Sequence, residues 1–217
     1  MNNSIGILLA GGTGSRLYPL TKSTNKHLLP VYNKPLIYYS LTTLMLAGNR
    51  EIVLITNPKD IKSFKQLLGD GSNFGIEISY LEQDQPKGLA HALYQAKNVV
   101  KDQNINLILG DNIFYGKGLK DYLHKAKSKS VNCLFTQDVS EPSKFGVLTR
   151  DKSNFPLEII EKPETPNSSE AVLGLYFYQK NIFSLIENIE PSERGELEIT
   201  ELNNMLLSTQ DVHIQNI

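Results

Sequence analysis

A glycine-rich turn placed directly after a short apolar run is the feature that most constrains this chain. Residues 5–9 form an apolar run typical of a strand that is buried on both faces. Three glycines follow within five residues: Gly11, Gly12 and Gly14. Glycine lets the backbone turn sharply and bring its N–H groups close to an anion. Because Arg16 and Lys26 come next, we expect the loop to fold back and present both cations to the same phosphates.

Two common phosphate-binding motifs do not fit this loop. The dinucleotide-binding fingerprint needs a third glycine three positions after Gly14, and that position holds Leu17. The other phosphate loop needs Gly-Lys-Ser/Thr, whereas Gly14 is followed by Ser15 and Arg16. Taken alone, a pair of glycines after a strand is equally compatible with an ordinary tight turn.

Apolar runs alternate with helical patterns along the chain, which predicts an α/β fold with a mostly parallel, doubly wound, Rossmann-like sheet. The expected strands of this sheet are 5–10, 51–56, 77–81, 106–109 and 131–136. Helices are expected at 35–48 and 88–100. Shorter strands at 146–149, 157–161 and 171–178 predict a small antiparallel portion over the sheet. We interpret residues 1–217 as a single domain.

Composition limits the classes of partner. The chain has 22 basic and 23 acidic residues and a net charge of −1, so no global field favours a nucleic acid polymer or an anionic membrane. The N-terminus has no basic region ahead of its apolar run, which argues against a signal peptide or membrane span. Cys133, the only cysteine, lies in an apolar run and is expected to be a buried strand residue. We expect a cytoplasmic protein.

A second chemical element lies at residues 107–116, where an apolar strand delivers Asp111 and Asn112 at its C-terminal end. Ligands of open α/β sheets bind at that edge. An aspartate there can simply cap the following helix. In a fold that also carries a triphosphate loop, a hard divalent cation such as Mg²⁺ is the better explanation, because it takes carboxylate and phosphate oxygens together.

With these features in view, the chain resembles the sugar-1-phosphate nucleotidyltransferase family, and its thymidylyl-transferring members most closely. The similarity covers nearly the whole chain. It is carried by residues 9–31, 33–48, 67–93, 107–116, 161–163, 174–178 and 194–200. The resemblance implies Mg²⁺-dependent transfer from dTTP to glucose 1-phosphate, giving dTDP-glucose and pyrophosphate for deoxysugar and polysaccharide synthesis, by a homo-oligomer. Another triphosphate, an amino-sugar phosphate, or a weakly active nucleotide-sugar-binding homologue remain alternatives.

The resemblance also implies a role for individual residues. Asp111 would bind the metal, and Arg16, Lys26 and Lys162 would act on the phosphates. The nucleotide would be bound by Leu9, Gly11, Gly12, Gly14, Gln83 and Gly88. The sugar phosphate would be bound by Leu109, Asn112, Gly146, Glu161, Lys162, Gly174, Tyr176 and Arg194.

Several of these residues also have plainer interpretations. Gln83 offers a donor and an acceptor to a pyrimidine, yet it lies in a polar stretch typical of an exposed loop. Glu161 and Lys162 are adjacent, so their side chains would point in opposite directions unless the strand ends there. Glu196, Glu198 and Thr200 are equally compatible with helix caps and surface charges. His27, His124 and His213 show no pattern of a triad or zinc site, and we interpret them as structural or exposed.

Two further expectations follow from the resemblance. His91 stands where a glutamine is expected, and no role follows from this. Family members continue past a segment like 211–217 into a strand and turn with a second metal-binding aspartate and then into C-terminal helices. We therefore expect this chain to bind nucleotide but to catalyse weakly, with the apolar side of a helix at 199–207 and the edge of the final strand short of cover.

Overall fold

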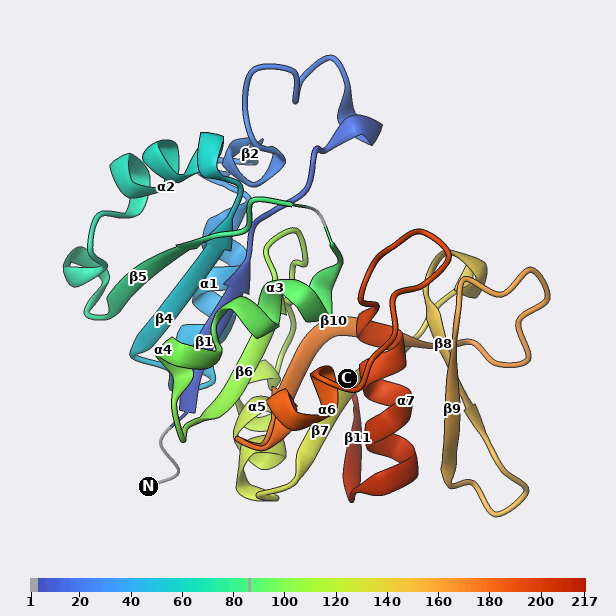
Figure 1. Cartoon of the computed structure of the whole chain (residues 1–217). Helices are drawn as coiled ribbons and strands as arrows, with labels where there is room; N and C mark the ends of the chain where they lie inside the picture. The colour runs from blue at the N-terminus through green and yellow to red at the C-terminus, as the bar shows by residue number, and fades with distance from the viewer. Residues whose placement is uncertain (1–3, 86) are drawn as a thin grey trace.

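One mixed sheet runs through the computed structural model, which describes residues 4–85 and 87–217 (Figure 1). Its nine strands are β1 (Ser4–Leu9), β4 (Glu51–Thr56), β5 (Glu77–Glu82), β6 (Asn104–Leu109), β7 (Asn132–Asp138), β8 (Gly146–Arg150), β9 (Pro156–Glu161), β10 (Glu170–Tyr178) and β11 (Val212–Asn216). The main path has the order β11-β7-β10-β6-β1-β4-β5, and β8 and β9 form a hairpin that pairs with β10. A separate two-stranded ribbon joins β2 (Pro30–Val31) to β3 (Lys34–Pro35).

Most neighbouring strands of the main path are parallel, as predicted from the sequence. β1 pairs with β4 and β6, β4 with β5, and β7 with β11, all in parallel. The exception is β10, which lies antiparallel between β6 and β7. The prediction that residues 171–178 belong to an antiparallel portion over the sheet was therefore wrong for their position, and the β8–β9 hairpin extends the same sheet by pairing with the first part of β10.

The burial of β10 explains why it lies inside the sheet. Leu175 and Phe177 belong to one buried cluster, whereas Tyr176 and Tyr178 belong to the other. A strand that buries apolar side chains on both faces needs covering layers on both sides and hydrogen-bonded neighbours at both edges. Only the interior of the main sheet offers that environment.

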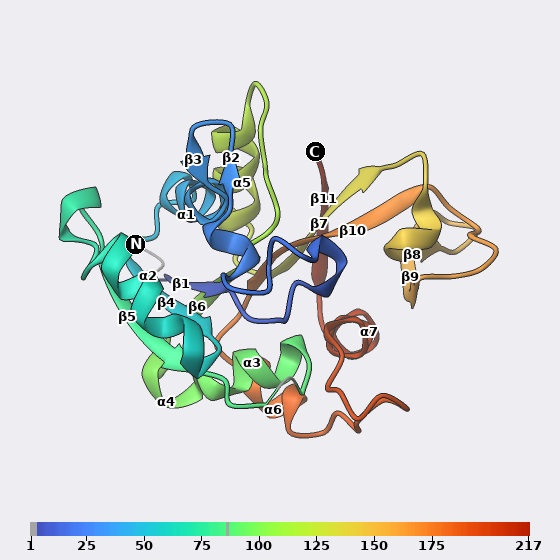
Figure 2. The ribbon, with the colours of Figure 1, turned by 90° about the horizontal axis from the view of Figure 1, so that it is seen from above.

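Helices cover both faces of the sheet (Figure 2). One cluster contains buried side chains of α1 (Ile37–Leu46), α2 (Ile61–Leu68) and α5 (Leu119–Ser128). The other contains those of α3 (Leu89–Gln95), α4 (Lys97–Val100), α6 (Ile182–Ile186) and α7 (Ile199–Thr209). The single helix expected at 88–100 is thus two helices that meet at Ala96.

The two clusters account for the apolar run at the start of the chain. Ile5, Ile7 and Leu9 of β1 pack into the cluster of α3 and α7, while Leu8 packs into the cluster of α1. The expectation that α7 lacks cover on its apolar side was wrong, because Leu202 and Leu206 are fully buried there. β11 does lie at an edge of the sheet, as expected.

Two other expectations can be compared with the described residues. Cys133 is buried on β7, as predicted, and burial raises the pKa of its thiol to about 12. None of the helices within 4–85 and 87–217 has the length and apolar character needed to cross a bilayer.

A partly buried ion pair fastens the hairpin to the main sheet. Glu170, at the start of β10, is only 9% exposed. Its two oxygens accept 2.8 Å hydrogen bonds from Nε and Nη2 of Arg150, at the end of β8. Thr136 of β7 donates a third at 2.8 Å. Burial raises the pKa of Glu170, but the bonds from Arg150 and Thr136 lower it further, so the carboxylate is ionised and joins three strands.

This pair yields a prediction about stability. Glu170→Ala should lower the free energy of unfolding by about 2 to 3 kcal/mol, because it leaves the guanidinium and a buried hydroxyl without their acceptor. Glu141→Ala is the matched control, since Glu141 pairs with Lys144 where both side chains are 64% exposed. The control should cost about 0.5 kcal/mol or less. Urea unfolding of both variants measures the difference, and equal losses would contradict the anchoring role.

Candidate active site

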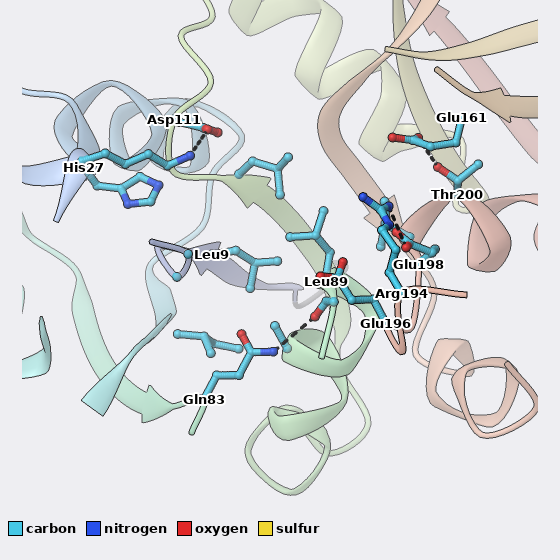
Figure 3. A pocket seen from close by; sticks show the side chains of 18 of the residues that line it. Leu9, His27, Gln83, Leu89, Asp111, Glu161, Arg194, Glu196, Glu198 and Thr200 are labelled. Atoms are coloured by element: carbon cyan, nitrogen blue, oxygen red, sulfur yellow. Dashed lines mark hydrogen bonds and ion pairs between the residues drawn. The ribbon is translucent and has the colours of Figure 1, made fainter. Parts of the chain in front are cut away.

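A cavity of about 370 Å³ opens at the C-terminal ends of the central parallel strands (Figure 3). Leu9 of β1, Ile55 of β4 and Leu109 of β6 form part of its apolar wall. Its charged lining residues come from the loops beyond β1 and β6, from the end of β9 and from the segment before α7. A site at this edge is what the parallel sheet predicts, because the strands there end side by side and their loops converge.

The glycine-rich loop forms one rim of the cavity. Gly11 and Gly12 line it, and Gly12 has a φ of 89°, in the left-handed region that favours glycine. The carbonyl of Gly12 accepts a 3.1 Å hydrogen bond from Asn57. The next part of the loop leads away: Gly14 caps the short 3₁₀ helix η1 (Ser15–Leu17), and Arg16 within it is exposed. Neither Gly14 nor Arg16 is among the residues that line the cavity.

Lys26 and Asp111 meet at the next part of the rim. Nζ of Lys26 donates a hydrogen bond to Oδ2 of Asp111, and Asn112 donates a 3.0 Å bond to Oδ1. Burial raises the pKa of Asp111, but the hydrogen bond and charge of Lys26 lower it further, so the carboxyl group is ionised at neutral pH. The structure thus brings a cation of the loop and the expected metal ligand into direct contact.

His27 also lines the cavity, a position that its sequence pattern does not predict. It is 2% exposed, and its Nδ1 lies 2.6 Å from Oδ1 of Asn25. A Cβ atom on Gly110 would lie 2.7 Å from the imidazole, so only glycine fits beside the ring. Burial, together with the charge of Lys26, lowers the pKa of His27 to about 4, and the ring is neutral at physiological pH. Its burial depends on residues distant in sequence, which no local pattern reveals.

Gln83 and Gly88 form the opposite side of the cavity. Nε2 of Gln83 donates a 3.2 Å hydrogen bond to the carbonyl of Gly88. Gly88 has a φ of 96°, and a Cβ atom there would lie 2.3 Å from the carbonyl oxygen of Leu197. Leu197 in turn donates to Lys87 at 2.8 Å and accepts from Ala90 at 3.2 Å. Close backbone approach therefore requires glycine here and joins the start of α3 to the segment before α7.

Glu161 and Lys162 both line the cavity although they are adjacent in sequence. β9 ends at Glu161, and Lys162 has a φ of 45°, so the alternation of a strand is broken between them. Lys162 donates to Oε1 of Glu161, and Thr200 donates to Oε2 at 2.7 Å. Burial raises the pKa of Glu161, but these two donors lower it further.

The segment before α7 brings the last charged groups to the cavity. Arg194 donates a 2.8 Å hydrogen bond to Glu198, and both line the cavity together with Glu196 and Thr200. From the sequence alone, the two glutamates and Thr200 are equally compatible with helix caps and surface charges. The signal that could have distinguished them is their membership of the 194–200 segment, which carried part of the family resemblance.

Four of the predicted sugar-phosphate residues lie behind the lining residues. Gly174 donates a 3.2 Å bond to Oδ1 of Asn112, and a Cβ atom on Gly174 would lie 2.6 Å from the side chain of Leu109. Tyr176 is buried and stacks on Tyr178, and burial raises the pKa of its hydroxyl. Gly146 leaves space for Glu161, whose Oε2 would lie 3.3 Å from an added Cβ atom. These residues support the wall rather than line it.

The donor set for a metal ion is small. Within residues 4–85 and 87–217, no three His, Cys, Asp or Glu side chains are grouped so that they could hold a cation. Asp111 supplies one ionised carboxylate that lines the cavity. This set fits Mg²⁺ only if phosphate oxygens and water complete the coordination, which is how this ion is commonly held in phosphoryl-transfer sites.

Known proteins resemble this chain over most of its length. The family described as nucleotidyl transferase matches residues 5–217. A glucose-1-phosphate thymidylyltransferase of Neisseria meningitidis is 47% identical over 211 residues, which are 97% of this chain and 73% of that protein. A protein of the same description from Mycobacterium tuberculosis is 49% identical over 203 residues, covering 94% of this chain and 70% of that protein.

Solved structures show the same architecture. A crystal structure from Bacillus anthracis, described as a glucose-1-phosphate thymidylyltransferase in complex with a sucrose, superposes with a TM-score of 0.91 at 40% identity and covers 99% of this chain and 87% of that one. A UDP-glucose pyrophosphorylase complexed with UDP-glucose superposes with a TM-score of 0.84 at 24% identity, over 99% of this chain and 90% of that one, and shows the shared fold.

Proposed function

This chain belongs to the nucleotidyl transferase family, and from that premise we propose that it transfers the thymidylyl group of dTTP to glucose 1-phosphate, giving dTDP-glucose and pyrophosphate. The observation that carries the proposal is the presence, in one cavity, of the glycine-rich loop, the Lys26–Asp111 pair and the Glu161–Lys162 pair. The relatives described as glucose-1-phosphate thymidylyltransferases, at 47% and 49% identity, support the choice of base and sugar.

The cavity suggests how the two substrates bind. We assign the base to Gln83 and Gly88, and the phosphates of dTTP to the backbone of Gly11 and Gly12 and to Lys26. Sugar 1-phosphate fits the other end, where Glu161 can accept from a sugar hydroxyl and Lys162 can bind the phosphate. In this arrangement Leu9 and Leu109 form the apolar wall between the two substrates.

The reaction is an attack by a phosphate oxygen of glucose 1-phosphate on the α-phosphorus of dTTP. A new P–O bond forms as the bond to the departing pyrophosphate breaks, with the two oxygens roughly in line. Both reactants are anions, so positioning and neutralisation of charge provide the catalysis, and no covalent enzyme intermediate is needed. Lys162 holds the attacking phosphate and Lys26 lies beside the phosphates of the nucleotide. Arg194 adds a third cation near the sugar phosphate.

We assign Arg16 to the departing pyrophosphate. Its guanidinium is exposed on η1, past the rim formed by Gly11 and Gly12. The β- and γ-phosphates of dTTP would therefore have to extend out of the cavity along the loop to reach it. A planar guanidinium suits that task, because it binds two phosphate oxygens at once.

Asp111 is the residue that would hold Mg²⁺. When bound, the ion would neutralise phosphate charge and fix the triphosphate for attack. The residues of this chain contribute the carboxylate of Asp111 and the cation of Lys26, which can exchange its carboxylate partner for a phosphate oxygen. Asn112 keeps the carboxylate oriented through its 3.0 Å bond to Oδ1.

The direct test is a panel of triphosphates assayed by pyrophosphate release. With glucose 1-phosphate and Mg²⁺, dTTP should be turned over, UTP should follow, and ATP should be slower by at least about tenfold, because a purine does not fit a site built for a small base. A chelator should abolish release. Equal turnover of ATP would contradict the base assignment, and no turnover of any triphosphate would contradict the function.

Asp111→Asn tests the metal ligand. The substitution is nearly isosteric and keeps an oxygen for Lys26, so the fold should remain, whereas Mg²⁺-dependent turnover should fall by about a hundredfold or more. Asp102→Asn is the control, since Asp102 has a side chain that is 97% exposed. Near-normal rates in Asp111→Asn would exclude the assignment.

Lys162→Ala tests the binding of the attacking phosphate. Its loss should raise KM for glucose 1-phosphate by about tenfold and lower kcat, while KM for dTTP changes little. Lys180→Ala, at a position where the side chain is 60% exposed, should leave all three constants unchanged. If the kinetic constants of Lys162→Ala match those of the control, Lys162 has no such role.

A further inference from the structure

A short chain of hydrogen bonds lies beside the proposed base site. Nε2 of Gln83 lies 3.2 Å from the carbonyl oxygen of Gly88 and 3.2 Å from Nδ1 of His91. On the far side of the imidazole, Nε2 of His91 lies 3.1 Å from Nε2 of the Gln95 amide. Gln83 is 9% exposed, whereas Gln95 is exposed. His91 therefore connects a buried amide at the cavity to an exposed amide on the outer part of α3.

The carbonyl of Gly88 fixes the direction of the hydrogen bonds in this series. A carbonyl oxygen only accepts, so the group of Gln83 that faces it must be the NH₂ group. The second proton of that group points at Nδ1 of His91, which must then carry a lone pair. A neutral imidazole has its proton on the other nitrogen, so Nε2–H of His91 is a donor. The Gln95 nitrogen faces it, and the exposed amide of Gln95 must turn over so that its oxygen accepts this bond.

The charge state of His91 agrees with this assignment. Burial, followed by the positive charge of Lys87, lowers the pKa of His91 below its usual value, which keeps the imidazole neutral at neutral pH. Both protons of the Gln83 amide are then used within the protein. What remains for a ligand is the carbonyl oxygen Oε1.

The Gln83 oxygen faces the cavity. Figure 3 shows the amide nitrogen turned towards its bond with Gly88 and the oxygen turned towards Leu9. Oε1 is 3.5 Å from the position of an added Cβ atom on Gly11, another lining residue. Gln83 itself lines the cavity, on the side opposite Lys26 and Asp111.

We infer that His91 is a specificity-determining residue that holds Gln83 as a pure acceptor, so that the base site takes a pyrimidine with a ring N–H. The inference rests on the proposed function. Thymine and uracil offer N3–H to Oε1. Cytosine has a lone pair at N3, which would face another acceptor in a partly dehydrated site, and such a mismatch is penalised strongly. His91 touches the base only through Gln83, which makes it a positioning residue.

Variants that lack a hydrogen-bond acceptor at position 91 test this role. His91→Leu and His91→Ala remove one of the two bonds that orient the amide, so Gln83 can turn its NH₂ group into the cavity more often. We expect the ratio of the Kd for dCTP to the Kd for dTTP, measured by calorimetry on the whole chain, to fall by about tenfold. His91→Gln offers an acceptor oxygen at the same place and should restore the ratio to within about twofold.

Tyr94→Phe is the matched control on the same helix, because the hydroxyl of Tyr94 donates to Glu187 and makes no hydrogen bond to Gln83, His91 or Gln95 among the described residues. It should leave the ratio unchanged. A merely structural role of His91 would weaken dTTP and dCTP alike, so a ratio that stays constant in both acceptor-free variants overturns the inference.

Turnover measurements separate this inference from the proposed function. In His91→Leu, kcat at saturating dTTP with glucose 1-phosphate should change by less than about threefold while KM for dTTP rises. Absence of turnover in the unaltered chain would count against the proposed function alone, because the binding ratio still decides whether His91 sets base selectivity.

Discussion

The parallel pairing of β1 with β6 is the interaction on which the rest of the site depends. The register aligns Leu9 with Leu109, and the pairing continues one residue further through a 2.8 Å bond from the N–H of Gly110 to the carbonyl of Leu9. Because both strands end at the same level, the glycine-rich loop and Asp111 leave the sheet side by side. Lys26 returns to meet Asp111 at that point. A shift of one residue in this register would turn each strand's alternating side chains to the opposite face and separate the loop from the carboxylate.

The second half of the site is carried by a different part of the sheet, and two contacts hold it in position. The Arg150–Glu170 pair fastens the β8–β9 hairpin to β10, and Glu161 and Lys162 lie at the end of that hairpin. The close approach of Gly88 to Leu197 joins the start of α3 to the segment that carries Arg194 and Glu198. The ion pair lies outside the cavity, whereas Gly88 lines it, and both contacts bear on how far apart the two ends of the cavity are. Reactants that must meet in line depend on that separation, since effective concentration falls when the reacting atoms are misplaced.

Local patterns in the sequence were enough to predict the parallel strands and the functional residues that follow them in the chain. β1, β4 and β6 bury both faces, so their apolar runs are continuous. Gln83 follows β5 directly, Asp111 comes just after β6, and Gly88 precedes the first residue of α3. The position of β10 could not be predicted, because the sequence of a strand does not by itself determine which distant strand it pairs with. The burial of His27 beside Gly110 depends on contact between segments that are far apart in the sequence. The orientation of Gln83 by His91 depends on the direction of hydrogen bonds, which the sequence does not show. Arg16 shows the converse, because its motif predicts a phosphate contact while its side chain lies beyond the cavity lining.

The charges of the cavity occur as pairs, and this bears on how it can receive two anions. Lys26 bonds Asp111, Lys162 bonds Glu161, and Arg194 bonds Glu198. Each carboxylate orients its cation and offsets the repulsion between cations held in one site. A phosphate that binds Lys26 competes with Asp111, and an oxygen of Asp111 released in this way becomes available to a divalent cation. We therefore expect the binding of triphosphate and of Mg²⁺ to assist each other. The bound phosphate frees the Asp111 oxygen that the cation needs, and the bound cation offsets the repulsion between Asp111 and the phosphate. The same exchange at Lys162 would free Glu161 to accept from a sugar hydroxyl, so the two ends of the cavity use one electrostatic arrangement.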